Sequence, residues 1–347
     1  MREGRMKNIT LGRTGITVPQ NGFGALPIQR DTKEVAVSLL RQAYEGGMRY
    51  FDTARAYSDS EEKLGMAFEG MYDKIFVATK TAAKTPEQFW KDLETSLNML
   101  KTDCIDVYQF HQVEQCWKPG DGSGMYECML QAKEEGKIRH IGVTAHKINV
   151  AYECVESDLY ETMQFPFSYL SGEKELKLVK MCREHNMGYI AMKGLAGGLI
   201  NRGEAAMAYM QQFDNVLPIW GVQRQKELDE WLSYMDRTPE MTDEIRAYIE
   251  KEKQELSGEF CRGCGYCMPC TVGIEINNCA RMSLMLRRAP SEAWLTEEWQ
   301  EKMAKIDDCV NCNKCRTKCP YELNTPELLR QNLADYRKVL AGEVSVK

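Results

Sequence analysis

The 347-residue sequence predicts an α/β barrel followed by a small, mainly helical domain that binds metal through cysteine. Eight apolar, strand-like runs alternate with eight helix-like segments between residues 20 and 236. Alternating strands and helices form a parallel sheet that is covered by helices, and eight such units favour a (β/α)8 TIM barrel. Eight of the fourteen cysteines lie in two compact clusters near the C-terminal end. These clusters predict a separate domain with metal ligands.

Composition restricts the class of partner and the compartment. The net charge of -6 and the pI near 5.5 argue against a nucleic-acid partner. No apolar run is long enough to span a bilayer, so no membrane partner is expected. The opening residues 1–8 lead into no apolar signal core, which makes export unexpected. Clustered cysteines are typical of metal binding in a reducing compartment, and we therefore expect a cytoplasmic protein.

The secondary structure is predicted from periodicity, with boundaries uncertain by two to four residues. The predicted strands cover residues 20–24, 48–52, 74–79, 104–110, 138–143, 161–165, 187–192 and 216–220. The predicted helices cover residues 32–46, 60–70, 86–100, 122–136, 147–156, 173–185, 203–213 and 225–236. Residues 7–19, with Gly12, Gly15 and Pro19 between short apolar pieces, predict a hairpin that closes the bottom of the barrel.

Capping residues and breaks set the expected boundaries. Thr85 before Pro86 predicts a capped helix start, and Asp31 or Thr32 caps the helix that contains Glu34. We expect the barrel to occupy residues 1–240 and a charged helical linker to occupy residues 241–258, ending at Ser257-Gly258. The cysteine-rich domain then covers residues 259–340, and residues 341–347 form a tail.

Three successive predicted strands end on ionisable side chains. Asp52, Lys80 and His111 follow apolar runs, and Tyr57 comes five residues after Asp52. In a parallel barrel the strand tails converge on one face, so these four side chains are expected to share a pocket. The alternative interpretation is that Asp52 and Lys80 form a structural ion pair and that Tyr57 is an aromatic residue at the rim.

Four segments resemble signatures of the aldo-keto reductase family, and the likeness runs in order through most of residues 7–236. They are Phe51-Asp52-Thr53-Ala54 with Tyr57, Thr79-Lys80-Thr81, Asp106-Val107-Tyr108-Gln109-Phe110-His111, and Gly136-Lys137-Ile138-Arg139-His140-Ile141-Gly142-Val143-Thr144. The resemblance implies a barrel that binds a nicotinamide cofactor and transfers hydride to or from a carbonyl carbon. It also implies that Tyr57 is the general acid, that Lys80 lowers its pKa, that Asp52 holds Lys80, and that His111 orients the carbonyl.

The resemblance implies a second set of residues around the nicotinamide cofactor, NADP or NAD. These candidate cofactor contacts are Gly24, Thr144, Gln164, Met192, Lys193, Gly221 and Arg224. Thr144 and Gln164 match places where the family hydrogen-bonds the nicotinamide carboxamide. His146, two residues further on, is a candidate for contact with the substrate.

Several positions depart from the family pattern. Ala145 stands where an asparagine is usual, and Met192 replaces an aromatic residue. Gly221, Val222 and Glu227 replace the lysine, serine and arginine that hold the 2′-phosphate of NADP in many relatives. Trp231, where an asparagine is frequent, is expected to stack on the adenine. We therefore expect only weak discrimination between NADPH and NADH.

The C-terminal cysteines have the spacing of iron–sulfur ligands. The first run contains Cys261, Cys264, Cys267 and Cys270, and the second contains Cys309, Cys312, Cys315 and Cys319 before Pro320. The second run has the spacing that bacterial ferredoxins use for a [4Fe–4S] cluster. Zinc is the alternative, because paired cysteines also suit it.

Two-cluster ferredoxins exchange the fourth ligand between their runs. On that pattern Cys319 completes the cluster of the first run and Cys270 completes the cluster of the second run. The long helical segments expected between the runs suggest a helical ferredoxin-like iron–sulfur domain, and not a compact β-rich one. The combination resembles a branch of aldo-keto reductases that carries such a domain, with two [4Fe–4S] clusters.

Three functions remain open at this point. The first is an NAD(P)-dependent oxidoreductase that acts on a small-molecule carbonyl or alcohol substrate. The second is an electron-transfer protein that serves a redox partner protein, with the barrel mainly a docking body. The third is a lyase that forms a Schiff base on Lys80 or Lys193, which would leave Tyr57, His111 and the clusters without a role.

Overall fold

The protein, as a computed structural model, is described over residues 4–256, 260–288 and 291–346. The predicted junction at Ser257-Gly258 and the predicted domain start at residue 259 lie outside the described residues. Contacts divide the chain into two units. The first runs to Gly194 and includes Arg202–Ile249, whereas the second contains Leu195–Asn201 and everything from Glu250 onward. The short segment Leu195–Asn201 thus groups with the cysteine-rich unit, although it follows a barrel strand.

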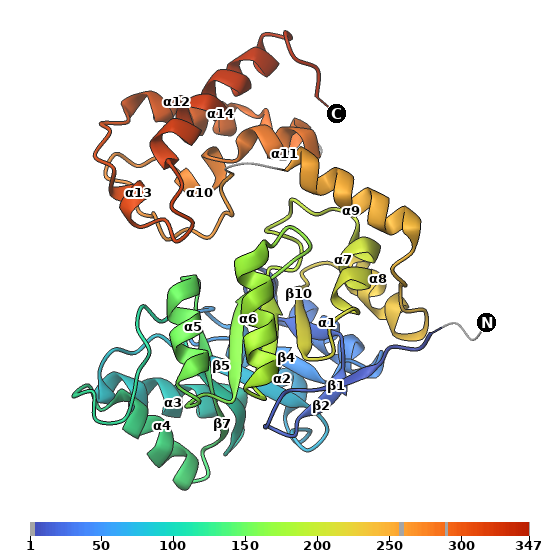
Figure 1. The fold of residues 1–347 in the computed structure, drawn as a ribbon, viewed down its shortest axis with the longest axis vertical. Helices are drawn as coiled ribbons and strands as arrows, with labels where there is room; N and C mark the ends of the chain where they lie inside the picture. Colours follow the sequence, from blue (N-terminus) through green and yellow to red (C-terminus); the bar gives the residue numbers. More distant parts are fainter. Residues whose placement is uncertain (1–3, 257–259, 289–290, 347) are drawn as a thin grey trace. The chain divides into compact units, whose positions relative to one another are not determined.

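In the described part of the chain, eight parallel strands close into a barrel, in the order β10-β3-β4-β5-β6-β7-β8-β9. Figure 1 shows strands of this barrel with helices outside them. The strands are β3 (Gly22–Gly24), β4 (Tyr50–Asp52), β5 (Phe76–Thr81), β6 (Ile105–Phe110), β7 (Ile138–Thr144), β8 (Thr162–Pro166), β9 (Gly188–Met192) and β10 (Val216–Gly221). Each overlaps one predicted strand. The predicted barrel is therefore confirmed.

Helices connect successive strands, as the alternating pattern predicts. They are α1 (Lys33–Glu45), α2 (Ser60–Phe68), α3 (Pro86–Leu100), α4 (Met125–Glu134), α5 (Ile148–Glu156), α6 (Glu173–Glu184), α7 (Gly203–Met210) and α8 (Gln225–Asp236). Thr32, and not Asp31, caps α1 by accepting a hydrogen bond from the Val35 amide. Thr85 caps α3 in the same way, with Pro86 at the first helical position. Both caps satisfy backbone N–H groups that lack a partner within the helix.

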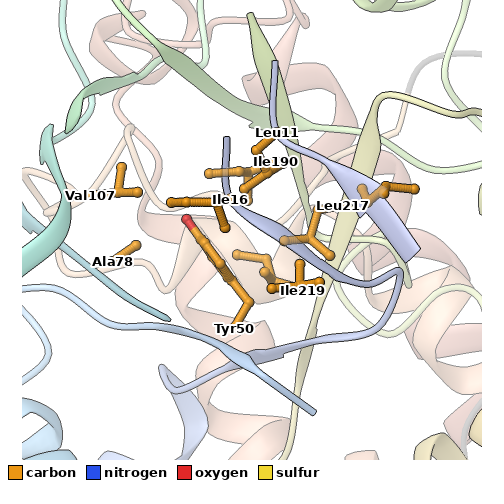
Figure 2. Packing of buried hydrophobic residues seen from close by; sticks show 10 residues of the cluster. Leu11, Ile16, Tyr50, Ala78, Val107, Ile190, Leu217 and Ile219 are labelled. Carbon is orange, nitrogen blue, oxygen red and sulfur yellow. The ribbon is translucent and has the colours of Figure 1, made fainter. Parts of the chain in front are cut away.

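The hairpin predicted for residues 7–19 is present. Strands β1 (Asn8–Thr10) and β2 (Thr17–Pro19) pair in antiparallel fashion. Their apolar side chains pack against residues that point into one end of the barrel, as Figure 2 shows for Tyr50 and its neighbours. The cluster contains Ile9, Leu11, Ile16, Val18, Tyr50, Ala78, Val107, Ile190, Leu217 and Ile219. The hairpin thus closes that end of the barrel. The C-terminal ends of the strands, where the candidate site residues lie, are at the other end.

The cysteine-rich unit is helical, as predicted, but its helices are distributed differently. The helical pieces between the two cysteine runs are short: α10 (Ile276–Cys279), α11 (Met282–Arg288), η2 (Ser291–Trp294), α12 (Glu297–Ala304) and η3 (Lys305–Asp308). The helix α9 (Asp243–Glu255) precedes the first run, and α13 (Lys314–Thr317) lies within the second. The long helix α14 (Thr325–Leu340) follows the second run and buries Leu328, Leu329 and Leu333. None of the described helices is long and apolar enough to cross a membrane.

Removing the α3 cap should weaken the barrel. In Thr85→Ala the side chain can no longer accept from the Gln88 amide, a bond of 3.3 Å. The free energy of unfolding should fall by about 1 kcal/mol, measured by urea denaturation followed by circular dichroism. Thr95→Ala, which removes a hydroxyl from the middle of the same helix, is the control and should cost nothing measurable, because alanine is the better helix former. Equal losses in both variants would contradict the capping role of Thr85.

Candidate active site and cysteine centre

The four side chains predicted to share a pocket lie together at the strand tails. Asp52 ends β4, Lys80 lies near the end of β5, His111 follows β6, and Tyr57 lies in the turn after β4. The Lys80 ammonium is 2.6 Å from Asp52 Oδ1 and 5.2 Å from the centre of the Tyr57 ring. The Tyr57 and His111 rings meet edge to face, with centroids 5.8 Å apart. The cation therefore lies beside the phenol, and the imidazole is next to both.

The centre of this group is a buried ion pair. Lys80 is 1% exposed and Asp52 is 2% exposed. Lys80 Nζ also donates to the Thr53 carbonyl oxygen at 2.6 Å, so two oxygens hold it in one position. Burial raises the pKa of Asp52, and the nearby Lys80 ammonium opposes that rise. A buried pair of this kind is costly to break, because either charge alone would be left unpaired away from water.

Gln109 is hydrogen-bonded to the ion pair through Asp52. The sequence analysis did not identify this residue as part of the site. Its amide nitrogen donates to Asp52 Oδ2 at 3.3 Å and to Gln164 Oε1 at 3.0 Å. Gln164 Nε2 lies 3.4 Å from Asp52 Oδ1, so Asp52 accepts from two amides as well as from Lys80. Gly142, opposite Gln109 in β7, leaves the room for this side chain, because a Cβ there would lie 2.8 Å from Gln109 Cγ. A glutamine inside an apolar strand was the available sequence signal.

The protonation states suit a proton donor beside a neutral imidazole. Burial lowers the pKa of His111 to about 3, and the positive charge of Lys80 acts in the same direction. His111 is therefore neutral at physiological pH and retains one N–H. Burial raises the pKa of Tyr57, Lys80 lowers it and Asp52 raises it. Lys80 thus acts on Tyr57 in the expected direction, but burial outweighs it, and the phenol holds its proton.

A second histidine lies close to this group. His146 is 6% exposed, and burial lowers its pKa well below the usual value. The charge of Lys193, and that of His111 when it is protonated, act in the same direction, which shows that both residues are near.

The candidate cofactor contacts also lie at strand tails, and the barrel register pairs several of them. Thr144 pairs with Gln164, and Gly221 pairs with Gly24. Met192 ends β9, and Lys193 follows it with a left-handed backbone, φ 58°. A Cβ on Gly24 would lie 3.2 Å from the Trp220 carbonyl oxygen, and a Cβ on Gly221 would lie 3.1 Å from Pro27 Cγ, so both glycines allow close packing at this part of the rim. Thr144 Oγ1 accepts from the Gln112 amide at 2.7 Å, which leaves its own hydrogen free to be donated.

Arg224 and Glu227 form a unit at the start of α8. Glu227 Oε2 accepts from the amides of Gln223 and Arg224 at 2.9 and 3.0 Å, so it caps the helix. Its other oxygen pairs with Arg224 Nη2 at 2.9 Å, and the Arg224 side chain is 79% exposed. Arg224 is thus at the surface and already shares its charge with an acid.

Trp231 does not lie where it could stack on an adenine. It is 2% exposed and stacks on Trp220, with ring centroids 4.0 Å apart and planes 8° apart. The expected adenine contact is therefore wrong, because both indoles are committed to the core between β10 and α8. Gly194 lies against the same pair, since a Cβ there would be 2.5 Å from the Trp220 ring.

The cysteines of the two runs come together within the second unit. A cavity with about 390 Å³ of atom-free space, part of it open to solvent, is lined by cysteines of both runs: Cys267, Cys270, Cys309, Cys312 and Cys315. Apolar groups such as Val272, Ile274 and Leu329 form much of the remaining wall. Cys270 of the first run thus lies beside three cysteines of the second run.

Cys261, Cys264 and Cys319 form a second group, and Cys267 lies near this group as well as in the cavity. Burial raises the pKa of Cys261, and negative charge on Cys264 and Cys319 would raise it further. Burial also raises the pKa of Cys267 to about 12, with Cys261 and Cys264 adding to the effect. Across residues 4–256, 260–288 and 291–346, no three cysteine, histidine or acidic side chains are close enough to bind a single metal ion.

Comparison with known families assigns both parts of the chain. Residues 20–233 match the model of the aldo/keto reductase family. Residues 260–324 match the model of a 4Fe-4S dicluster domain.

Individual proteins resemble part of the chain. The uncharacterized oxidoreductase YqkF of Bacillus subtilis is 28% identical over 56% of this chain and 67% of its own length. L-Galactose dehydrogenase of Arabidopsis thaliana is 27% identical over 55% of this chain and 66% of its own length. The chain thus spans about two thirds of each of these curated relatives.

Solved structures share the fold. The holo form of aldo-keto reductase AKR11C1 from Bacillus halodurans has a TM-score of 0.63 at 23% identity, covering 71% of this chain and 96% of that one. An aldo-keto reductase from Klebsiella pneumoniae in complex with NADPH has a TM-score of 0.58 at 22% identity, covering 71% of this chain and 94% of that one.

The neutral state of His111 predicts a pH dependence of stability. An unfolded histidine has a pKa of about 6.5, whereas in the folded protein the pKa is about 3. Between these values the unfolded chain binds the additional proton, so stability falls as the pH drops below 6.5. Between pH 7 and pH 5, the free energy of unfolding of His111→Asn should fall by about 2 kcal/mol less than that of the wild type. Urea denaturation at both pH values measures this difference, and an unchanged pH slope in the variant would contradict it.

Proposed function

The chain belongs to the aldo-keto reductase family, and from this premise we propose that its barrel reduces a carbonyl compound, or oxidises the matching alcohol, with a nicotinamide dinucleotide. The protein is an oxidoreductase of the aldo-keto reductase type. The observation that carries the proposal is the 2.6 Å Asp52–Lys80 pair beside the Tyr57 ring, with His111 against that ring. We assign Asp52, Tyr57, Lys80 and His111 to catalysis.

The four residues account for the movement of the proton. The nicotinamide, when bound, supplies the hydride for the carbonyl carbon. The oxygen then carries negative charge, and the Tyr57 hydroxyl donates its proton to that oxygen as the charge develops. Lys80 stabilises the tyrosinate that remains, since opposite charge close to a phenolate favours the ionised form. Neutral His111 donates a hydrogen bond to the same oxygen and orients it.

The alternatives explain less of this geometry. A purely structural ion pair would not require Tyr57 and His111 beside it, at the end of the barrel where family chemistry occurs. A Schiff-base lyase would require a free amine, but Lys80 Nζ is already held by Asp52 and Thr53. The electron-transfer alternative uses only the second unit and leaves the complete tetrad without a role.

We propose that the cofactor is NADP or NAD, with weak discrimination between the two. The NADPH complex of the Klebsiella neighbour supports NADP as one cofactor of this fold. A 2′-phosphate gains most from a bidentate arginine, whereas here Arg224 is exposed and paired with Glu227. Gly24, Thr144, Gln164, Met192, Lys193 and Gly221 are the other proposed contacts.

We further propose two [4Fe–4S] clusters in the C-terminal unit. The dicluster family match and the cysteine-lined cavity support this proposal. One cluster would be held by Cys261, Cys264, Cys267 and Cys319, and the other by Cys309, Cys312, Cys315 and Cys270. Such clusters exchange single electrons when present. A redox partner protein is one candidate for donating or accepting these electrons.

Removing the proposed proton donor should abolish turnover and leave binding intact. Tyr57→Phe should lose at least about a thousandfold in kcat, within the range attributed to general acid catalysis. Its Kd for NADPH, measured by fluorescence titration, should match that of the wild type. Tyr126→Phe, which removes a buried hydroxyl that donates to the Leu159 carbonyl at 2.5 Å, is the control and should stay active. Full carbonyl reduction by Tyr57→Phe would exclude this role.

Cofactor titration tests the proposed lack of discrimination. The Kd values of NADPH and NADH should differ by no more than about tenfold, or about 1.4 kcal/mol. Titrations at low and moderate salt show how much of any difference is electrostatic. A hundredfold preference for NADPH that is lost in Arg224→Ala would contradict this proposal. It would show that Arg224 breaks its ion pair with Glu227 and binds the 2′-phosphate.

The cluster content is directly measurable. Anaerobically reconstituted protein should hold about eight iron and eight sulfide per chain, as two cubane clusters require. Cys312→Ser should lose about half of this iron and destabilise the second unit, because ligation and folding are coupled. Cys279→Ser is the matched control, since Cys279 is a buried thiol of the same unit outside both proposed ligand sets. Stoichiometric zinc without sulfide would contradict the proposal.

A further inference from the structure

The segment that follows β9 has an unusual backbone. Lys193, Ala196, Gly197 and Gly198 all have left-handed φ values, of 58°, 49°, 69° and 91°. Two of these four residues are not glycine, and a left-handed backbone is strained at such residues unless their surroundings hold it in place. The segment begins directly after Met192, at the tail of β9. Its conformation therefore bears on the proposed nicotinamide contacts Met192 and Lys193.

Two arginines of the cysteine-rich unit hold this segment by its backbone. Arg281 Nη1 donates to the Gly197 carbonyl at 2.8 Å, and Arg288 Nη1 donates to the Leu199 carbonyl at 2.8 Å. Arg288 is itself fixed by two hydrogen bonds to Glu252, of 2.6 and 2.9 Å. These contacts explain why Leu195–Asn201 groups with the second unit.

Arg281 also touches the first cysteine run. Its guanidinium lies against Gly263, since a Cβ on that residue would be 2.7 Å from Nη1. A Cβ on Gly197 would be 2.9 Å from the same nitrogen. Gly263 lies between Cys261 and Cys264, and its amide donates to Cys261 Sγ at 3.4 Å. The guanidinium is therefore in contact with both a proposed ligand loop and the strained segment.

The charge of Arg281 favours the same arrangement. Burial lowers the pKa of this guanidinium, and negative charge on Cys261 and Cys264 raises it. Iron ligation requires cysteine in the thiolate form, which places that negative charge beside the arginine permanently. Ligation also fixes the backbone of the Cys261–Cys264 loop.

We propose that Arg281 is a positioning residue that couples cluster occupancy at Cys261, Cys264, Cys267 and Cys319 to the affinity of the barrel for its nicotinamide cofactor. This inference rests on the proposed function. Ligation orders the loop around Gly263, the loop holds Arg281, and Arg281 holds the Gly197 carbonyl. The strained backbone after Met192 then keeps its binding conformation. The first cluster thereby controls cofactor binding without passing an electron to it.

The coupling is reciprocal in thermodynamic terms. If the cluster increases the affinity for the cofactor, the cofactor stabilises the cluster-loaded state by the same factor. The strain held by Arg281 sets the size of the effect. If one non-glycine residue left its strained left-handed conformation, the chain would spend less time in the form that binds the cofactor. We expect a tenfold weaker Kd, which corresponds to about 1.4 kcal/mol.

The test uses the anaerobic, cluster-loaded full chain. Arg281→Met removes the guanidinium and retains a side chain of similar length. Arg287→Met is the matched control, because Arg287 bonds to Asp335 and to the Ser283 carbonyl oxygen within the same unit. We expect Arg281→Met to bind NADPH about tenfold more weakly by fluorescence titration, and residues 193–201 to exchange amide hydrogens faster. Arg287→Met should behave as the wild type in both measurements.

A second pair of variants covers the case in which Arg281→Met loses its cluster or fails to fold. Gly197→Ala places a methyl group against Arg281, whereas Gly198→Ala meets nothing within 4 Å. Both residues have positive φ, so the pair shares the backbone strain and differs in the arginine contact. Iron and sulfide counts should equal those of the wild type in both variants. We expect Gly197→Ala to bind NADPH more weakly than Gly198→Ala.

The results separate this inference from the proposed function. Equal NADPH affinity and equal hydrogen exchange in Arg281→Met and the wild type would overturn the coupling, as would equal behaviour of the two alanine variants. A wild-type protein that binds neither NADPH nor NADH would contradict the proposed function instead. In that case the exchange rates of residues 193–201, compared between cluster-loaded and cluster-free protein, still decide whether the cluster holds the segment.

Discussion

The buried ion pair of Asp52 and Lys80 is the interaction on which the rest of the barrel site depends. Both charges are almost completely removed from water, and neither can be left alone there without a large cost. Asp52 therefore accepts from Gln109 and Gln164 as well as from Lys80, and Lys80 is held in a single position. That position is what places a cation beside Tyr57.

The same burial sets the electrostatics of the proposed proton donor. A phenol taken out of water resists ionisation, and Lys80 reduces this effect without cancelling it. The site without substrate thus keeps a protonated phenol and a neutral imidazole, which are the forms needed to donate hydrogen bonds to a developing oxyanion.

The cysteine-rich unit adds a second constraint through the chain itself. A nicotinamide moves two electrons together and a [4Fe–4S] cluster moves one, so the proposed coupling between them is structural and involves no direct exchange of electrons. The segment Leu195–Asn201 is joined by peptide bonds to barrel residues at each end and makes its own contacts with Arg281 and Arg288. The proposed mechanical role of the first cluster rests on this arrangement, because a strained backbone needs external support.

The sequence by itself determined the barrel, the order of its elements, the residues at the strand tails and the spacing of the cysteines. These features are local, because apolar periodicity, capping residues and ligand spacing can each be recognised within a short stretch of sequence. The tertiary structure alone decided which distant residues meet. It stacked Trp231 on Trp220 and away from any ligand, placed Gln109 on Asp52, and set Arg281 between Gly197 and Gly263. Such contacts join residues that no short motif connects, because they depend on how separate elements pack.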